Sequence, residues 1–234
     1  MRYLFLHAHP DDETLSSAAI IRCLVAAGHE CAVLTATRGE RGEARPGTVP
    51  AGVSLTAHRR LERAAALVQL GATDAGWLGT WPNRAAGLHD RAYRDSGMAW
   101  VTPTQAGPGP DLAADSLWLA DPAEVAADLA AAVAYCKAEE VVSYDAGGGY
   151  GHPDHVRCHE AARRVAGELG LPFSQIVLER DKATAWFDGL GEAERIRAAY
   201  RAYPSQFVVS GWDITHVGGQ ADTIRLAAGL RRVG

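Results

Sequence analysis

Apolar and polar residues alternate along the first two thirds of the chain in blocks that predict repeated strand–helix units. Short apolar runs, each typical of a buried strand, occupy residues 3–7, 31–36, 141–144 and 174–179. Longer segments with apolar residues at helical spacing occupy residues 14–27 and 57–70, and each is followed by a glycine. This order of elements favours a mostly parallel sheet covered by helices.

Two further helices are predicted from the residues at their ends. Asp121 is a candidate N-cap, Pro122 fits the first helical position and Glu124 completes a capping box. Another helix follows residue 155 and stops at Gly170. The predicted apolar faces are Leu61, Ala64, Ala65 and Val68 in the helix at 57–70, then Val125, Leu129, Val133 and Cys136, and finally Cys158, Ala161, Ala162, Val165 and Leu169.

One long segment lacks a clear period. Residues 80–118 are rich in Pro, Gly, Trp and Asp, and irregular segments of that length are usually functional, such as lids or binding loops. After about residue 183 the pattern does not define the order of elements. There is no internal repeat and no domain linker, so we expect a single domain over residues 1–234.

Composition and charge exclude several classes of protein. The 234 residues are 47% hydrophobic and 22% charged, with a formal net charge of −5, so no basic face is expected for nucleic acid or anionic lipid. No apolar stretch approaches the ~20 residues of a membrane span. The cysteines form no CxxC pair and are interpreted as small buried hydrophobes, which favours a cytoplasmic protein. They are Cys23, Cys31, Cys136 and Cys158.

Two histidine motifs each follow a predicted strand directly. They are His9-Pro10-Asp11-Asp12-Glu13 and His152-Pro153-Asp154-His155. In an α/β sheet, ligands bind in the crevice at the carboxyl ends of the strands. We therefore expect both motifs at the same edge of the sheet, although they are far apart in the sequence.

Catalytic zinc is usually held by three protein ligands from His and carboxylate, with one position left for water. His9 and Asp12 lie three residues apart in a loop-to-helix turn, and His155 in the later helix is suited to be the third ligand. Asp11 would then be free to act as general base. His152 would be placed to protonate a leaving amine or to stabilise an oxyanion.

Each of these residues also has a simpler interpretation. Asp12 or Asp154 alone is often only a helix N-cap, and a lone histidine in a loop is more often solvated than a ligand. We place six histidines in that second class: His7, His29, His58, His89, His159 and His216. The recurrence of His-Pro-Asp at two strand ends, each opening a helix, favours a metal site over these alternatives.

The motifs AHPDDETL at 8–15 and YDAGGGYGHPDH at 144–155 resemble those of the LmbE/PIG-L-type de-N-acetylases. Within that family they are most similar to the actinobacterial branch that acts on mycothiol precursors and conjugates. The resemblance covers about the first 170 residues and includes RDSGM at 94–98 and the helix opening at 59–62. Residues 203–206 (YPSQ) look like a short family element in which histidine is common at the position of Tyr203. The segment after Gln206 matches nothing familiar.

The resemblance implies a Rossmann-like fold, one zinc ion per chain and a role for each matched residue. Zinc would be held by His9, Asp12 and His155, although another divalent metal such as Fe²⁺ is compatible. The implied catalytic residues are Asp11 as base, His152 as acid or stabiliser, Asp154 orienting His152, and Tyr150 at the carbonyl oxygen. The implied substrate contacts are Arg59, Asp95, Glu43 and Met98, with Glu40 as an alternative to Glu43. Residues 1–170 would be the core, and 171–234 would help to shape the substrate pocket.

The sequence therefore predicts a zinc-dependent hydrolase that removes an N-acetyl group from a small amino sugar or its glycoside. An amidase that cleaves a larger conjugate is the main alternative within enzymes. A nucleotide-binding domain lacks its GxGxxG loop, and a non-catalytic metal sensor leaves Asp11 and His152 without a role. Arg59 has a simpler interpretation as well, as a partner of Glu62 on its own helix. A homo-oligomer is compatible with the sequence.

Overall fold

A seven-stranded sheet forms the centre of the computed structural model, which describes residues 1–233. Its strand order is β3-β2-β1-β6-β7-β12-β8. The sheet strands are β1 (Arg2–His7), β2 (Glu30–Thr35), β3 (Thr73–Trp77), β6 (Glu140–Ser143), β7 (Phe173–Val177), β8 (Ala185–Asp188) and β12 (Ala227–Val233). The main helices are α1 (Asp12–Ala26), α2 (Leu55–Leu70), α3 (Pro122–Cys136), α5 (Pro153–Leu169) and α6 (Ala193–Arg201).

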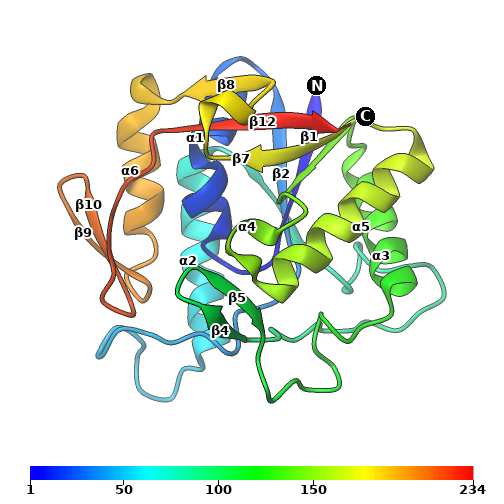
Figure 1. Cartoon of the computed structure of the whole chain (residues 1–234), viewed down its shortest axis with the longest axis horizontal. Helices are drawn as coiled ribbons and strands as arrows, with labels where there is room; N and C mark the ends of the chain where they lie inside the picture. Colours follow the sequence, from blue (N-terminus) through cyan, green and yellow to red (C-terminus); the bar gives the residue numbers. More distant parts are fainter. Residues whose placement is uncertain (234) are drawn as a thin grey trace.

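Five neighbouring strands, from β3 to β7, run parallel, and β12 is antiparallel to both β7 and β8. Helices α1, α2 and α6 cover one face and α3 and α5 cover the other (Figure 1). Two apolar cores result, because each face of a parallel sheet must be buried under helices. The predicted α/β fold, with a mostly parallel sheet between two helical layers, is confirmed.

The connection between strands changes direction at the centre of the sheet. Strand β1 continues through α1 to β2 on one side, whereas its other neighbour, β6, continues through α5 to β7 on the opposite side. Because α1 and α5 lie on opposite faces, the loops that open them diverge and leave a crevice between the carboxyl ends of β1 and β6. Such a switch point is where ligands bind in open α/β sheets.

The predicted elements are present, with boundaries that shift by one or two residues, but strand β3, a hairpin in the irregular segment and the elements beyond residue 183 escaped prediction. Strand β3 contains Asp74 and Gly76 and has no apolar run. Within the segment predicted as irregular, β4 (Met98–Thr102) and β5 (Gln105–Pro108) pair as an antiparallel hairpin. Beyond residue 183, β12 inserts between β7 and β8 and completes the main sheet.

One predicted helix face is wrong, and a second is wrong at a single residue. In α2, Leu61 is 63% exposed, Val68 is 70% exposed, and Ala64 and Ala65 are exposed too. The buried face instead carries Arg59, Glu62 and Arg63 together with Ala66, Leu67 and Leu70. In α5, Leu169 is 49% exposed, although the rest of its predicted stripe is buried.

The capping box predicted for α3 is only half formed. The Asp121 side chain accepts a hydrogen bond from the Ala123 N–H, as expected of an N-cap. The Glu124 carboxylate, however, pairs with Arg84 and Arg91 from the long segment before the helix. Glu124 therefore anchors that segment to α3 instead of closing the cap.

The remaining elements are short. A three-stranded sheet comprises β9 (Phe207–Ser210), β10 (Asp213–His216) and β11 (Ala221–Thr223). Helix α4 (Gly148–Gly151) precedes α5, and two 3₁₀ turns, η1 (Arg180–Lys182) and η2 (Leu190–Glu192), flank β8. Among the described residues, no helix is both long and apolar enough to cross a bilayer.

Candidate active site

The first histidine motif forms the turn from β1 into α1. Pro10 interrupts the backbone hydrogen bonding of the strand, and Asp11 adopts a left-handed conformation with φ 93° before the helix begins at Asp12. A non-glycine residue in this region costs about 1–3 kcal/mol and persists where its surroundings impose it. Here the Asp11 N–H donates to the buried carboxylate of Glu13 at 3.1 Å, and this hydrogen bond stabilises the turn.

The second motif forms the turn from β6 into α5, one strand away in the sheet. Gly148, at φ +62°, lies so close to α5 that an added Cβ would stand 2.9 Å from the Cβ of His155. This close approach lets the Gly148 carbonyl accept a hydrogen bond from His155 Nδ1 at 3.2 Å. The glycine loop before the motif therefore sets the orientation of the His155 ring.

The two turns bring three histidines together. The rings of His9 and His152 lie 4.5 Å apart between centroids, and those of His152 and His155 lie 5.1 Å apart. One nitrogen from each falls within 4.8 Å of the others, and a second group of possible metal ligands joins His9 and His152 with Asp95 and Asp154. All of these side chains are buried.

Hydrogen bonds determine which ring nitrogen of His9 and of His155 is available to bind a metal. His9 Nε2 donates to Asp154 Oδ2 at 3.2 Å, so in the neutral ring that would bind a metal the lone pair lies on Nδ1. His155 Nδ1 donates to the Gly148 carbonyl, so its lone pair lies on Nε2. A metal-binding histidine almost always donates its other N–H to such an acceptor, which fixes the tautomer.

Both lone pairs face the same oxygen. His9 Nδ1 lies 3.2 Å and His155 Nε2 lies 3.3 Å from Asp12 Oδ2. Ligands of a tetrahedral zinc ion, with bonds of about 2.0–2.1 Å, are separated by about 3.3 Å. His155 Nε2 is buried and has no hydrogen-bond partner, which is expensive unless a ligand completes the site. These distances are compatible with a divalent metal held by His9, Asp12 and His155, although Asp12 belongs to neither group of clustered ligand atoms, so this ligand set stays a prediction.

The local charges also favour a bound cation. Burial alone would lower the pKa of His9, but Asp95, Asp12 and Asp154 together raise that pKa well above its usual value. The pKa of Asp12 lies well below its usual range, against the effect of burial, because His155 and His9 stabilise the carboxylate. Without a metal, the nearby carboxylates favour a protonated His9. A bound metal cation would balance the same negative charge.

Tyr144, which the sequence analysis did not single out, positions two of the candidate ligands. Its hydroxyl donates to Asp12 Oδ2 at 2.7 Å and accepts from the Ala8 N–H at 2.8 Å. Its ring stacks on His155 with centroids 4.0 Å apart and planes at 11°. The signal in the sequence was its place, the first residue after buried strand β6 and directly before the glycine loop.

Asp11 stands beside this donor set and is paired with Arg59. Asp11 Oδ2 accepts from Arg59 Nη2 at 2.9 Å, and the same guanidinium donates to the Pro10 and Gly39 carbonyls. Burial raises the pKa of Asp11 to about 7, although the Arg59 charge lowers it. A carboxylate with that pKa is suited to general-base chemistry at neutral pH. The alternative pairing of Arg59 with Glu62 is wrong, because Glu62 accepts from Ser205.

The contact of Asp154 differs from the expectation. Its carboxylate contacts His9 and accepts from the Ser96 hydroxyl and N–H, instead of reaching His152. His152 is oriented by the backbone of Asp154, whose N–H donates to His152 Nδ1 at 3.2 Å. The second nitrogen of His152, Nε2, therefore carries the ring hydrogen. Burial and the nearby His9 and His155 lower the pKa of His152 to about 2, so the ring is neutral.

The RDSGM segment closes over the two motifs. Asp95 Oδ1 lies 3.6 Å from His9 Nε2 and accepts from the Gly97 N–H, and its own N–H donates to Glu40. Ser96, which sequence analysis had not assigned a role, ties this segment to Asp154. Asp95 and Arg59 are thus engaged inside the protein, and their substrate contacts stay predictions.

The other predicted substrate residues are more exposed. Tyr150 in α4 is 41% exposed, and its ring centroid lies 5.4 Å from that of His155. Met98 at the start of β4 is 38% exposed. Glu43 lies in the exposed loop after β2, and its carbonyl accepts from Gln206 Nε2. The contacts of all three with a substrate stay predictions.

The short element at 203–206 lies behind the first motif. The Tyr203 hydroxyl donates to Glu13 Oε1 at 2.9 Å, and Ser205 donates twice to Glu62. Two histidines expected to be solvated are buried instead. His7 Nε2 lies 2.9 Å from the Ser17 hydroxyl, and His159 Nδ1 donates to the Tyr144 carbonyl. Neither belongs to a group of candidate metal ligands.

Comparison with known families agrees with this arrangement. Residues 4–166 match the family described as PIG-L, GlcNAc-PI de-N-acetylase. The chain belongs to the PIG-L family. The matched segment begins in β1 and ends in α5, so it contains both histidine motifs and the switch point between them.

Curated PIG-L relatives come from actinobacteria. A 1D-myo-inositol 2-acetamido-2-deoxy-alpha-D-glucopyranoside deacetylase of Kineococcus radiotolerans is 46% identical over 166 residues, covering 70% of this chain and 44% of the relative. The protein of that name from a Nocardioides species is 36% identical over 214 residues, covering 86% and 66%. The chain therefore spans about half to two thirds of the length of these relatives.

Solved structures share the PIG-L fold at lower identity. The zinc-inhibited form of a teicoplanin deacetylase is 22% identical with a TM-score of 0.56, covering 88% of this chain and 85% of the other. A 4-carboxy-2-hydroxymuconate hydratase from Pseudomonas putida is 18% identical with a TM-score of 0.58, covering 100% and 96%. Because a hydratase and a deacetylase share the fold, the reaction must be argued from the site.

Proposed function

We propose that the protein is a metal-dependent N-deacetylase that hydrolyses the acetamide of a small amino-sugar substrate. The observation that carries this proposal is the arrangement of His9 and His155. Each commits one ring nitrogen to a protein acceptor and turns the other toward Asp12 Oδ2. Three such ligands hold a catalytic ion with one coordination position open. Asp11 lies beside the set and is not needed as a ligand.

Zinc held by His9, Asp12 and His155 would supply a Lewis acid for the acyl carbonyl and a water of lowered pKa. Asp11, with a pKa raised to about 7, accepts a proton from the attacking water. Arg59 fixes the carboxylate in place through its 2.9 Å contact.

Two further residues act on the amide itself in this proposal. The Tyr150 hydroxyl donates to the carbonyl oxygen as negative charge develops there. His152, neutral and carrying its hydrogen on Nε2, also donates to the developing oxyanion, and the amine nitrogen receives the proton that Asp11 has taken. The C–N bond breaks, the amine leaves with Asp11 again ionised, and the acetic acid formed passes its proton to the amine, so that the products are acetate and an ammonium group. The neutral state of His152 favours the role of stabiliser over that of proton donor.

The relatives are named for the deacetylation of an inositol glycoside of N-acetylglucosamine. From this we infer an N-acetylglucosamine-type glycoside as the substrate. Zinc is the metal that the donor set suits best, with Fe²⁺ as the alternative. The proposed setting is the cytoplasm. No contact in the structure favours the amidase alternative, and the relatives are named deacetylases.

The test measures metal content and acetate release together. The purified chain is stripped with a chelator, reloaded with zinc or Fe²⁺, and incubated with methyl 2-acetamido-2-deoxy-glucoside or with a bulkier N-acyl amide. We expect one metal per chain and acetate release from the acetamido sugar that disappears after stripping and returns on reloading. A fully loaded protein that releases no acetate from the sugar, but cleaves the bulkier amide, would establish the amidase alternative instead.

A further inference from the structure

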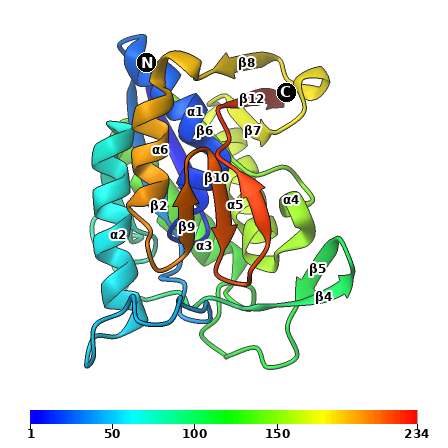
Figure 2. The ribbon, with the colours of Figure 1, turned by 90° about the vertical axis from the view of Figure 1, so that its left-hand side faces the viewer.

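Large apolar side chains lie exposed on the β4–β5 hairpin, beside the candidate active site. Trp100 is 57% exposed and Met98 is 38% exposed, and both belong to β4. In Figures 1 and 2 the hairpin extends from the body of the molecule next to α4. An exposed tryptophan lacks the stabilisation that burial would bring, so its position beside a candidate active site favours a functional role.

The hairpin is held against α4 by a close backbone contact. Gly151, at φ +94°, approaches β5 so closely that an added Cβ would lie 2.5 Å from the Ala106 carbonyl oxygen. Ala106 pairs with Trp100 across the hairpin. The backbone contact therefore fixes the position of Trp100 relative to α4. This position does not depend on how the Trp100 side chain packs.

Trp100 continues an aromatic surface that begins at the candidate metal ligands. Its ring lies 5.9 Å from that of Tyr150, with the planes at 34°. Tyr150 in turn lies 5.4 Å from His155 and 6.1 Å from His152, in both cases nearly edge-on. The surface thus runs from the ligands through Tyr150 to Trp100, away from the buried carboxylates.

We propose that Trp100, with Met98 beside it, forms a subsite for an apolar ring carried by the substrate beyond its acetamido sugar. The inference rests on the proposed function, because the acetamide at the metal ligands fixes where the rest of the substrate extends. Trp100 and Met98 are uncharged, and the faces of aromatic rings pack favourably against flat apolar groups. An aryl group on the anomeric oxygen is the simplest probe of this subsite.

The test compares the binding of phenyl and methyl 2-acetamido-2-deoxy-glucosides by calorimetry. Zinc-loaded protein with Asp11→Asn is used as the parent so that neither ligand is hydrolysed. We expect the parent to bind the phenyl glycoside about ten-fold more tightly, a size usual for one aromatic contact with its buried area. Trp100→Ala should abolish this preference and leave the affinity for the methyl glycoside unchanged.

Two variants control for damage to the hairpin. Val101 is 72% exposed on the same strand, and its side chain lies against Gly107 on the opposite face from Trp100. Val101→Ala should therefore keep the preference, and Trp100→Phe should retain most of it. Equal affinities in the parent would overturn the subsite. So would an equal loss for both glycosides in Trp100→Ala, which would make Trp100 a support for Tyr150.

Acetate release by the unmodified protein, measured separately on the methyl glycoside, tests the proposed function alone. Turnover of that glycoside without any phenyl preference would leave the function standing and remove the subsite. A phenyl preference that depends on Trp100, in a protein that releases no acetate from either glycoside, would support the subsite and reject the function.

Discussion

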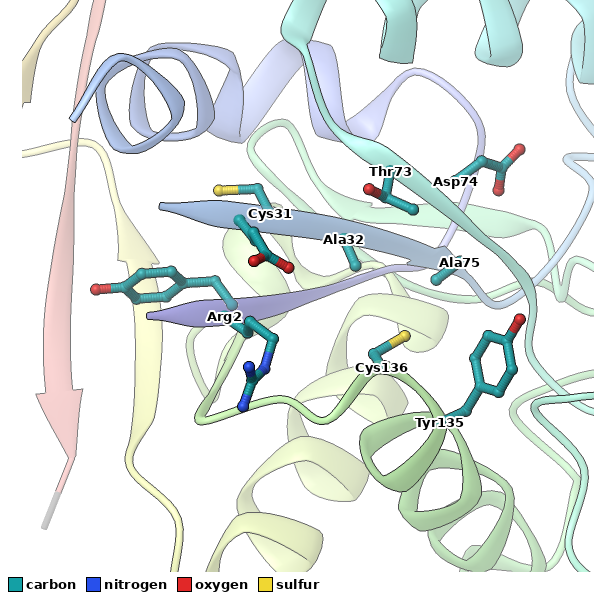
Figure 3. A pocket seen from close by; sticks show the side chains of 10 residues that line it. Arg2, Cys31, Ala32, Thr73, Asp74, Ala75, Tyr135 and Cys136 are labelled. Atoms are coloured by element: carbon teal, nitrogen blue, oxygen red, sulfur yellow. The ribbon is translucent and has the colours of Figure 1, made fainter. Parts of the chain in front are cut away.

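Polar side chains lie both at the amino ends of the parallel strands, here called the amino edge, and at their carboxyl ends, the carboxyl edge. The two edges differ in whether these side chains have partners within the protein. At the amino edge a cavity of about 300 Å³ opens between β1, β2, β3 and the end of α3 (Figure 3). Two of its charged residues have partners within the protein: Asp74 pairs with Arg63, and Arg2 donates to the Lys137 carbonyl. At the carboxyl edge, buried histidines and carboxylates converge, and His155 Nε2 has no partner.

This difference indicates that a cluster of buried potential metal ligands marks the candidate site better than a cavity does. Two cysteines line the amino-edge cavity, Cys31 and Cys136, and thiols there could in principle be reactive. Burial raises the pKa of Cys31 to about 12 and also raises that of Cys136, so neither thiol ionises readily. A thiolate is the reactive and metal-binding form, so the amino edge lacks the chemistry that the carboxyl edge has.

The largest effect should come from removing a ligand at the carboxyl edge. His155→Ala leaves only His9 and Asp12 facing the proposed metal, and two protein ligands hold zinc weakly. We expect loss of the metal by elemental analysis and loss of acetate release to background. Cys136→Ala at the amino edge is the matched control and should keep full occupancy. Retention of metal by the His155 variant would show that the ligand set is wrong.

Next in size is the removal of the proposed base. Asp11→Asn keeps a hydrogen-bond acceptor for Arg59 but cannot take a proton. We expect the metal to stay and turnover to fall by about two to four orders of magnitude, the usual range for a general base. Metal content and kcat are measured on the same preparation. If this variant loses its metal, Asp11 is a ligand and its assignment exchanges with that of Asp12.

Removing the Tyr144 hydroxyl sharpens the comparison by perturbing a ligand without deleting it. Tyr144→Phe removes the donor to Asp12 Oδ2 and the acceptor of the Ala8 N–H. Changes to such supporting contacts typically weaken metal binding by about 10–100-fold. Competition with a chelator of known affinity measures this effect. An unchanged affinity would limit Tyr144 to packing against His155.

The sequence predicted the site's residues better than their contacts. His9, Asp12, His152 and His155 stand out because they recur in short motifs at strand ends. The partners that orient them come from far along the chain: Ser96 reaches Asp154, and Tyr144 reaches Asp12. Such long-range contacts depend on how the strands are ordered in the sheet, which periodicity alone does not reveal. For this reason Asp154 was predicted to contact His152, whereas in the structure it contacts His9.

The fold shows the same limit in α2. Its pattern suggested that Leu61 and Val68 face the core, on the assumption that charged residues face water. Arg63 is buried instead, because it finds Thr35, Asp74 and two backbone carbonyls across the neighbouring strands. Glu62 is buried because Ser205 approaches from the C-terminal part of the chain. Strands without such buried charges, such as β1 and β2, were predicted correctly.

A smaller effect is expected behind the first motif. Tyr203→Phe removes the hydroxyl that donates to the buried Glu13 carboxylate, which in turn accepts from the Asp11 N–H. Loss of one partner of a buried polar group costs about 1–2 kcal/mol of unfolding free energy. Denaturant titration measures this cost. Stability equal to that of the unmodified protein would mean that Glu13 is satisfied by Thr14 and Asp11 alone.

The smallest effect is expected at the amino edge. Tyr135 lines the cavity there and is 60% exposed, so Tyr135→Ala widens the cavity mouth without opening the core. Surface substitutions of this kind usually change the unfolding free energy by about 0.5 kcal/mol or less. Because this residue lies at the opposite end of the strands from both histidine motifs, metal content and kcat/KM should match those of the unmodified protein within about two-fold, a difference below 0.5 kcal/mol. A larger change in kcat/KM with stability unaltered would mean that the two edges are coupled, and that the amino-edge cavity communicates with the metal ligands through β1 and β2.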